Sequence, residues 1–484
     1  MRKSAKFILV TLSAVVALAG CRGIPTKKES RARAQVQAMQ RLYRPDDERP
    51  ALPKLQAESS LEDYLRFAML NNPQVEAAYY DWRESVERIT VERSLPDPKL
   101  TFEMFFADTV TSLMPGLMTD LPGPGKLAAR AGVASAESES KYFQFQSEAL
   151  QAAFAVKKSY YPLHFLSEKI RVNTDTLSLL ADLEKLARAQ NEVGKATLQD
   201  VLRAQIEQEK LSNEVANLED SRRLLLAQFK AALGLRANQS DPPIPAKVEF
   251  VATNVSDDEL LKSALANNPR LKQMEAEIEM AEAGIRVARK EKIPDFTAGF
   301  ETDVKAAPVV WNPQFSMTLP IWRDKIAAEI AAAQHNKRAA EARLTAEQIA
   351  VGVDFAEQSF MIREAGRELS LLSERLLPRA RQSLEVSRAA YRSGQVDFLN
   401  VIDAERSLLD FQLDEIAAHT EREVALAQLS LIVAGVPPAG APFPLFASNV
   451  KLAEAEVIVI DDTVSVRVQK MLQKSGSGGG NATD

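Results

Sequence analysis

Hydrophobic and polar positions alternate along short stretches of the chain, which predicts β-strands with one apolar and one polar face. In the first stretch every second position is apolar: Leu100, Phe102, Met104 and Phe106. The same period recurs at residues 296–301 and 314–319. The segment 110–121 has a poorer strand pattern because it contains Pro115 and Gly116. Each half of the chain is therefore expected to supply two short strands.

Long helical patterns follow each pair of strands. We expect two outgoing and two returning helices, at about 125–191, 324–392, 197–234 and 397–434. An outgoing helix of this length would extend roughly 100 Å at 1.5 Å per residue. The turns fall at Gly194 and Gly394, and Pro162 and Pro378 are expected to kink the outgoing helices rather than end them.

The chain is a tandem duplication. Two motifs recur at a constant offset of 196 residues: Ser60-Leu-Glu-Asp as Ser256-Asp-Asp-Glu, and Asn71-Asn-Pro as Asn267-Asn-Pro. Further on, Gly194 matches Gly394 at an offset of 200. Each serine is expected to cap the start of a helix. Each proline should begin a new helix, because proline is tolerated in a first turn and not in a helix interior.

Composition narrows the classes of function. The chain has 60 Lys+Arg against 66 Asp+Glu, a net charge of −6, whereas nucleic-acid-binding domains are typically basic. One cysteine excludes a disulfide framework, and the three histidines are scattered along the chain. No nucleophile, general base or phosphate-loop pattern is present. We therefore expect neither an enzyme nor a cofactor-binding or metal-holding protein.

The N-terminus indicates secretion. Residues 1–20 have a basic start, an apolar run and small residues, as in a signal peptide. They end in Leu18-Ala-Gly-Cys21, which resembles the lipobox of bacterial lipoproteins and makes Cys21 the expected lipidation site, with palmitate among its acyl chains. Arg22 at the following position, by the same resemblance, favours the outer membrane. A buried cysteine beside an ordinary cleavage site is the alternative.

No later stretch reaches 18 consecutive apolar residues, so a helical membrane span is not expected. Four strands cannot close a barrel, and open strand edges in lipid would leave backbone groups without hydrogen bonds. The strands therefore belong either to a soluble sheet or to a barrel shared by several chains. Three chains would supply twelve strands, a number within the range of outer-membrane barrels.

With the duplication and the Asn-Asn-Pro helices, two segments make the chain resemble the TolC-type outer-membrane efflux proteins over about residues 59–436. These segments are Leu319-Pro-Ile-Trp-Arg-Asp-Lys325 and Tyr391-Arg-Ser-Gly-Gln-Val-Asp-Phe-Leu-Asn400-Val-Ile-Asp403. The resemblance implies a mainly helical fold with a small β part. Long helical hairpins would form a periplasmic α-barrel, and four strands per chain would join a twelve-stranded outer-membrane barrel in a homotrimer. The implied partners are a periplasmic adaptor (membrane fusion protein), an inner-membrane pump of the RND type and outer-membrane lipid, with no nucleic acid.

The resemblance also implies where the periplasmic gate lies. The family's acidic and aromatic gate positions fall on Asp200, Tyr391, Asn400 and Asp403. This chain departs from the family twice, because Asn400 replaces a carboxylate and Val396 replaces an arginine. The expected salt-linked lock is thereby weakened. The alternative is that Asp200 and Asp403 are solvated helix-surface residues.

The substrate class is less sharply indicated. Leu121-Pro-Gly-Pro-Gly-Lys126 is similar to an element of the heavy-metal subgroup, the cobalt–zinc–cadmium and copper–silver channels, which favours metal-ion efflux. Efflux of organic compounds stays open. Met104, Met114 and Met118 suggest a copper site, because thioether sulfur suits Cu(I). Lipid-facing or packed positions are the commoner explanation of methionines in such strands. Two other protein classes also stay open: a periplasmic adaptor, and a coiled-coil scaffold lipoprotein.

The expected organisation follows the duplication. It comprises a signal peptide (1–20), a lipid-anchored and extended N-terminal segment (21–58), the first repeat (59–234, strands about 99–121), a linker (235–255), the second repeat (256–436, strands about 295–320) and a C-terminal tail (437–484) that is flexible at its end.

Overall fold

The computed structural model describes residues 25–106, 110–245, 257–306 and 308–433. The chain divides into two compact units, which are treated separately here. The sheet unit is formed from Met1–Arg41, Ala77–Phe145 and Pro269–Gln348, and the hairpin unit from Leu42–Glu76, Gln146–Asn268 and Ile349–Asp484. Cys21, Ser256 and the tail 437–484 lie outside the described residues.

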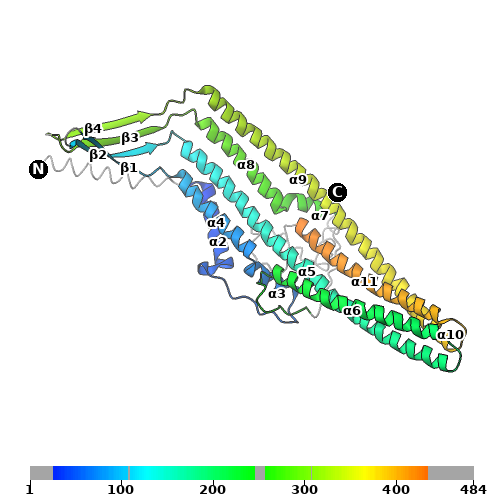
Figure 1. The fold of residues 1–484 in the computed structure, drawn as a ribbon. Coiled ribbons are helices and arrows are strands. Elements are labelled where there is room, and N and C mark those ends of the chain that lie inside the picture. Colours follow the sequence, from blue (N-terminus) through cyan, green and yellow to red (C-terminus); the bar gives the residue numbers. More distant parts are fainter. Residues whose placement is uncertain (1–24, 107–109, 246–256, 307, 434–484) are drawn as a thin grey trace, which may run out of the picture. The chain divides into compact units, whose positions relative to one another are not determined.

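The sheet unit contains a four-stranded antiparallel sheet built from both repeats (Figure 1). Its strands are β1 (Lys99–Phe106), β2 (Val110–Leu121), β3 (Phe296–Asp303) and β4 (Val310–Met317), in the order β1-β2-β3-β4. The two repeats meet where β2 pairs with β3, from Gly116 opposite Glu301 to Leu121 opposite Phe296. The expected two strands per repeat are present.

β2 is a better strand than its sequence indicated. It is the longest of the four, with 12 residues, and runs through Pro115 and Gly116. Pro115 is tolerated because β2 pairs with β3 only from Gly116 onward, so the missing N–H falls where β2 has a single neighbour. Gly116 is required because a Cβ atom there would lie 2.3 Å from Cγ of Glu301 on β3.

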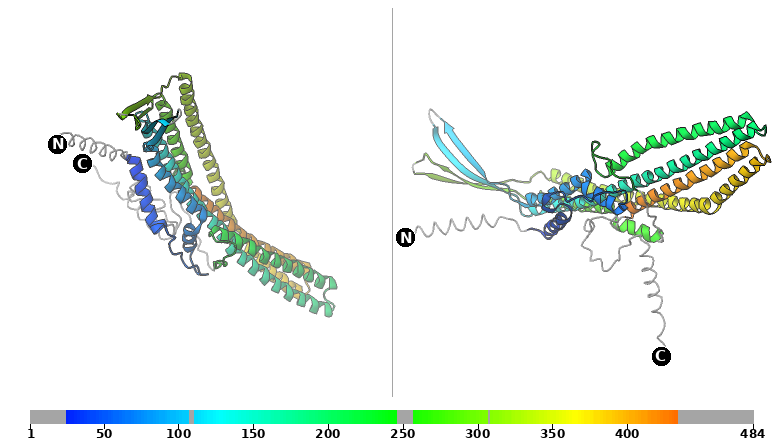
Figure 2. Two further views of the ribbon diagram at one scale, coloured as in Figure 1. Left: turned by 60° about the vertical axis from the view of Figure 1, so that its left-hand side comes forward. Right: turned by 90° about the horizontal axis from the view of Figure 1, so that it is seen from below.

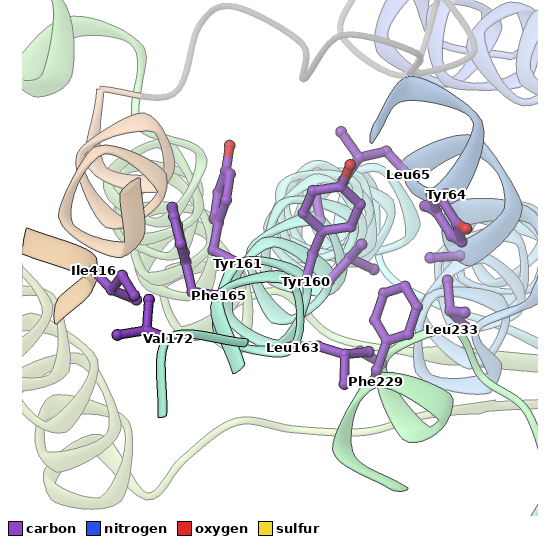
Figure 3. Close-up of a cluster of buried hydrophobic side chains, with 14 residues drawn as sticks. Tyr64, Leu65, Tyr160, Tyr161, Leu163, Phe165, Val172, Phe229, Leu233 and Ile416 are labelled. Carbon is purple, nitrogen blue, oxygen red and sulfur yellow. The ribbon is translucent and has the colours of Figure 1, made fainter. Parts of the chain in front are cut away.

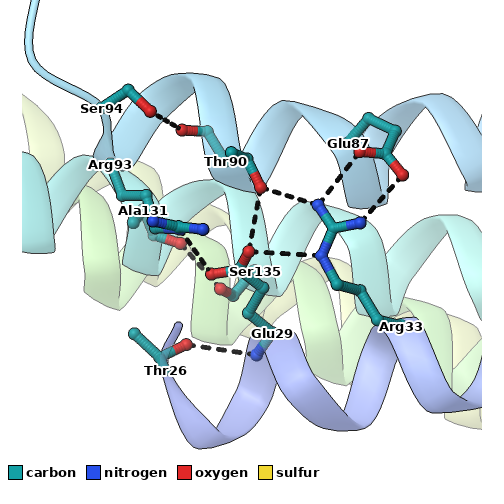
Figure 4. A network of polar contacts seen from close by, with 9 residues as sticks. All are labelled: Thr26, Glu29, Arg33, Glu87, Thr90, Arg93, Ser94, Ala131 and Ser135. Atoms are coloured by element: carbon teal, nitrogen blue, oxygen red, sulfur yellow. Dashed lines mark hydrogen bonds and ion pairs between the residues drawn. The ribbon is translucent and has the colours of Figure 1, made fainter. Parts of the chain in front are cut away.

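The N-terminal segment is not extended throughout, so that expectation was wrong. Helix α2 (Lys27–Tyr43) occupies nearly half of it, followed by a short 3-10 turn, η1 (Pro45–Asp47). Within the sheet unit, the carboxylate of Glu29 is fully buried against α4 (Pro73–Arg93), 2.8 Å from Arg93 and 2.9 Å from the hydroxyl of Thr90 (Figure 4). Arg33 joins the same network through Glu29 and Glu87. These tertiary contacts stabilise a helix that was not predicted from the sequence.

The expected helices are present with small shifts of their ends. Besides α4, they are α3 (Leu61–Asn71), α5 (Lys126–Glu192), α6 (Leu198–Ala232), α7 (Asp257–Asn267), α8 (Pro269–Lys290), α9 (Arg323–Leu371), α10 (Leu377–Arg392) and α11 (Phe398–Ile432). Ser60 caps α3 through a capping box with Asp63. Pro73 and Pro269 each begin a helix directly after the Asn-Asn pair.

The two internal prolines behave differently. Pro162 lies inside α5, which continues without a break. Before Pro378 the chain forms a π-helical segment, η2 (Leu372–Leu376), which separates α9 from α10. A π-turn accommodates a residue that cannot donate to the helical ladder, so the second proline is absorbed by a local change of helix type.

The core of the hairpin unit is rich in aromatic residues (Figure 3). The rings of Tyr160 and Phe229 pack against Tyr64 with centroids 5.7 and 5.3 Å away. Asn71 donates from Nδ2 to the carbonyls of Leu233 and Gly234, at 3.0 and 3.1 Å, and so satisfies the end of α6. In the second repeat Asn268 does the same for α11, with Nδ2 3.0 Å from the carbonyl of Ile432. The asparagines of the repeated motif therefore bind the two returning helices.

Candidate channel elements: the sheet and the two hairpin tips

One face of the sheet is apolar and exposed across all four strands. The pairing register places Leu100, Leu117, Phe300 and Pro313 in one row on this face. Phe102 and Phe315 share the face and are 62% and 71% exposed. An apolar surface that extends over four strands is typical of a protein that contacts lipid or a large partner.

The opposite face is polar and internally hydrogen-bonded. Lys99 donates to Asp120 at 2.7 Å, and Gln314 donates to Glu301 at 2.6 Å. The register places these polar side chains on the same face: Lys99, Thr101, Glu103, Ser112, Asp120, Thr297, Glu301, Asp303, Asn312, Gln314 and Ser316. A sheet with one lipid-compatible and one water-compatible face has the two surfaces that a channel wall needs.

The three methionines of β1 and β2 divide between these faces. Met104 lies on the apolar face, whereas Met114 and Met118 lie on the polar face. Met114 sulfur is 3.9 Å from the amide nitrogen of Asn312. Among the described residues no cluster of His, Cys, Asp and Glu is suited to a metal ion.

The two outer strands have one neighbour each. Among the residues that the structure describes, β1 pairs only with β2 and β4 only with β3, so each leaves one backbone edge unpaired there. Unpaired edges beside an exposed apolar face favour pairing with another copy. Across the described ranges, no helix is long and apolar enough to cross a membrane.

The first hairpin tip, between α5 and α6, is held by polar contacts. Gly194 adopts a φ of 73°, which favours glycine, and closes the turn. Asn191 donates from Nδ2 to the carbonyl of Ala196 at 2.8 Å. The carboxylate of Asp200 accepts from the backbone N–H of Thr197 at 3.0 Å and so caps the start of α6.

The second tip, between α10 and α11, is held by apolar packing. Gly394 has a φ of 75° and takes the place of Gly194. Tyr391 is 5% exposed and packs on Phe398 with ring centroids 5.3 Å apart. Val396, the position of the expected arginine, contacts the same apolar cluster, which also includes side chains of α5 and α6. The two hairpins therefore lie side by side on one shared cluster (Figure 2).

The structure brings together only part of the expected gate set. Burial raises the pKa of Tyr391 to about 12, and the negative charge of Asp200 on the other hairpin adds to that rise. Asn400 is exposed in the first turn of α11. The side chain of Asp403 is 58% exposed and lies 3.9 Å from Arg406. Tyr391 thus lies in the shared cluster, whereas Asn400 and Asp403 are exposed on α11.

The model of the family described as outer membrane efflux protein matches residues 65–235 and 260–435, one segment in each repeat. The chain belongs to this family. Its members are efflux channels, and both halves of the duplication match. This makes the chain an outer-membrane channel for efflux and disfavours the adaptor and the scaffold lipoprotein.

Individual relatives agree with this assignment. The chain is 23% identical over 370 residues to the cobalt-zinc-cadmium resistance protein CzcC of Cupriavidus metallidurans, covering 73% of this chain and 85% of that protein. The solved structure of CusC has a TM-score of 0.67 at 17% identity and covers 80% of this chain and 98% of CusC. The open state of the Neisseria gonorrhoeae MtrE outer membrane channel has a TM-score of 0.65 at 17% identity, covering 81% and 95%. These structures confirm the fold class, a mainly helical chain with one small four-stranded sheet.

The sequence did not single out the contact that joins the two hairpins of this efflux protein. Arg406 on α11 binds Glu207 on α6 through two nitrogens, at 2.5 and 3.2 Å. Beside it, Glu405 is 3% exposed, and burial followed by the nearby Glu207 raises its pKa to about 7. Glu405 lies one helical turn after Val401 on the buried face of α11. The sequence did contain a signal for this contact, because Glu405 places a carboxylate at a position where the helical period expects an apolar residue.

Proposed function

We propose that this chain is the outer-membrane channel of a tripartite efflux system that exports divalent metal cations. The observation that carries the substrate class is the similarity to a cobalt-zinc-cadmium resistance protein along 85% of that protein's length. The polar face of the sheet supports it, because Glu103, Asp120, Glu301 and Asp303 outnumber Lys99 there. Negative groups along a pore wall favour the passage of cations.

The proposed assembly is a homotrimer. Each chain supplies four strands with two unpaired edges, so three copies give a closed barrel of twelve strands in which β4 of one copy pairs with β1 of the next. Closure removes edges that would otherwise leave backbone groups unpaired in lipid. The hairpin tips would meet a periplasmic adaptor, which connects them to an inner-membrane pump of the RND type.

Lipid attachment at Cys21 is part of the proposal. The chain can span at most about 3.5 Å per residue. Glu29 ties the start of α2 to the last turns of α4, which lead into β1. Thr26 follows Cys21 by five positions, so an acyl chain at Cys21 would begin within roughly 20 Å of the start of α2. This distance suits an anchor in the same membrane as the strands.

We propose further that the two tips form the periplasmic gate, with Asp200, Tyr391, Asn400 and Asp403 around the opening. The burial of Tyr391 in the cluster shared by the two hairpins supports a closed arrangement held mainly by packing. Asp403, repeated by threefold symmetry, would place three carboxylates at a narrow opening and favour cations there.

Transport tests the substrate class directly. The chain is expressed with its cognate adaptor and pump in a bacterium that lacks its own outer-membrane channel, and tolerance of cobalt, zinc and cadmium salts is compared with tolerance of organic dyes. We expect protection against the metals alone. A strain that lacks the pump but carries the channel is the matched control. Protection against dyes and not metals would overturn the metal assignment and leave an efflux channel for organic compounds.

A further inference from the structure

The contact between α6 and α11 contains an ion pair and a buried acid side by side. Glu207 is largely buried, with 16% of its side chain exposed, and it binds Arg406 through both carboxylate oxygens. Lys210 lies 3.2 Å from the same carboxylate. Because Glu207 belongs to the first hairpin and Arg406 to the second, this bidentate pair links the two tips.

Glu405 lies next to this pair on the buried face of α11, where it is 3% exposed. At the equivalent position of the first hairpin, Gln205 donates to Glu184 of α5 at 2.9 Å. The offset of 200 residues places Leu384 on α10 where the first hairpin has Glu184. Leu384 is buried in the shared apolar cluster, so the second hairpin presents a hydrocarbon side chain where the first presents a hydrogen-bond partner.

The charged groups that act on Glu405 come from two helices. α6 contributes Glu207, and α11 contributes Arg406 and Asp410. The shared cluster receives apolar side chains from α5 and α10, including Leu180 and Leu384. Glu184 of α5 is engaged by Arg188, Gln205 and Gln208.

We propose that Glu405 and the Arg406–Glu207 pair form a proton-dependent latch between the two hairpin tips, engaged when Glu405 is neutral and released when it ionises. A neutral Glu405 leaves Arg406 to Glu207 and stays buried beside the pair without the cost of burying a charge. An ionised Glu405 repels Glu207 and competes with it for Arg406. The inter-hairpin contact then weakens, and the tips separate more readily.

The direction of the pH dependence follows from the packed state. The pKa of Glu405 is raised to about 7 in the packed tip, from an ordinary value of 4.5. The packed tip therefore has its full stability below pH 4.5 and loses stability as the pH rises toward 7. Each pH unit in this window changes the ratio of released to latched tips by at most about tenfold per subunit. Acid should favour the latched state.

The inference rests on the proposed gate, so its test separates the two. The purified full-length protein is placed in planar bilayers, and its conductance is measured between pH 5 and pH 8. We expect several-fold higher open probability at pH 8 in the wild type. Glu405→Gln should hold the low value at every pH, because the amide stays neutral. Gln205→Glu, at the matched position of the first hairpin, should not reproduce the wild-type response when combined with Glu405→Gln.

A spectroscopic measurement is independent of conductance. The infrared difference between wild type and Glu405→Gln should contain a protonated carboxyl band at pH 5 that disappears near pH 7. A pH response that survives in Glu405→Gln, or a carboxyl already ionised at pH 5, would overturn the latch and leave the channel intact. Absence of conductance from both the wild type and Arg406→Ala at every pH would overturn the channel function, and the latch with it.

Discussion

The two hairpin tips have the same backbone plan and opposite chemistry. Both turn at a glycine with positive φ, and both begin the returning helix three or four residues later. The first tip is closed by the side chains of Asn191 and Asp200, which bind backbone groups. In the second, the matched positions are Tyr391, buried on Phe398, and the exposed Asn400. Duplication therefore preserved the path of the chain while the forces that hold each turn diverged.

The largest effect should come from the buried aromatic of the second tip. Tyr391→Ala removes a side chain from the shared cluster, and truncation of a buried aromatic costs about 3–5 kcal/mol. Asn191→Ala, its matched control in the first tip, removes one hydrogen bond and should cost about 1 kcal/mol. Hydrogen exchange of the tip amides measures both. Equal protection losses in the two variants would show that the tips do not differ as described.

The capping carboxylate of the first tip should have an intermediate effect. Asp200→Ala removes the acceptor for the N–H of Thr197, and loss of such a cap costs about 1 kcal/mol. Asn400→Ala, at the matched position, should change little. The first turns of α6 and α11 are the amides to compare by hydrogen exchange. If the amides of α11 lost as much protection as those of α6, the described difference between the two tips would be wrong.

The exposed acid of the second tip should have a small electrical effect. If Asp403 faces its symmetry mates about 6–8 Å away, each pair interacts by roughly 0.5–0.7 kcal/mol in water. Asp403→Asn should then reduce cation preference in a planar bilayer by a small factor. The effect should shrink near 1 M salt, where the Debye length is about 3 Å. Unchanged selectivity at low salt would assign Asp403 to the outer surface.

Val396→Arg is the converse substitution for the same tip. It restores the basic residue of the family and is expected to lower resting conductance by adding a charge beside the opening. Because Val396 packs on the apolar cluster, the arginine must extend outward and will also loosen the turn. Val396→Met, which keeps the site apolar, is the control. Higher resting conductance with arginine would show that packing at this position outweighs charge.

The smallest difference should appear in how acid affects the two hairpins. Hydrogen bonds from Arg188 and Gln205 lower the pKa of Glu184 in the first hairpin. The stability that Glu184 contributes is therefore present above its ordinary value of 4.5 and is lost as the pH falls below it. In Glu405→Gln, in which the proposed latch no longer titrates, limited proteolysis should cut the first tip faster at pH 4 than at pH 6, and adding Glu184→Gln should reduce this change. A first tip that becomes more resistant in acid would contradict the assignment.

Periodicity in the sequence was enough to predict most of the elements. The alternation around Phe102 and Phe315 identified strands whose apolar face is exposed, and the repeated Asn-Asn-Pro marked helix ends in both halves. The strand pattern of β2 was judged poor because of Pro115. Whether that proline disturbs the sheet depends on where β2 pairs with β3, and the sequence of β2 alone does not determine this pairing. Helix α2 was missed although Ala32, Met39 and Tyr43 lie at helical spacing on its buried face, because the many charged residues between them obscured that pattern.

The tips were predicted less completely than the fold. Resemblance led to Asp200, Tyr391, Asn400 and Asp403, and the structure buries only Tyr391 in the shared cluster. Glu405 and its neighbours were missed because their importance depends on which helix face lies against α6. That contact joins residues about 200 positions apart. Helical period alone gives the face of α11 that is buried, and not the charge on the opposing helix.

The exposed apolar face of the sheet and its two unpaired edges also have a consequence for biogenesis. A newly secreted chain that has folded as described presents a broad apolar surface and two open strand edges to the aqueous periplasm. Such surfaces drive aggregation whenever copies meet outside their correct geometry. Transit to the membrane must therefore be faster than random encounter, or shielded by a holdase chaperone. The yield of mature protein should then fall when synthesis outpaces insertion, however stable the finished channel is.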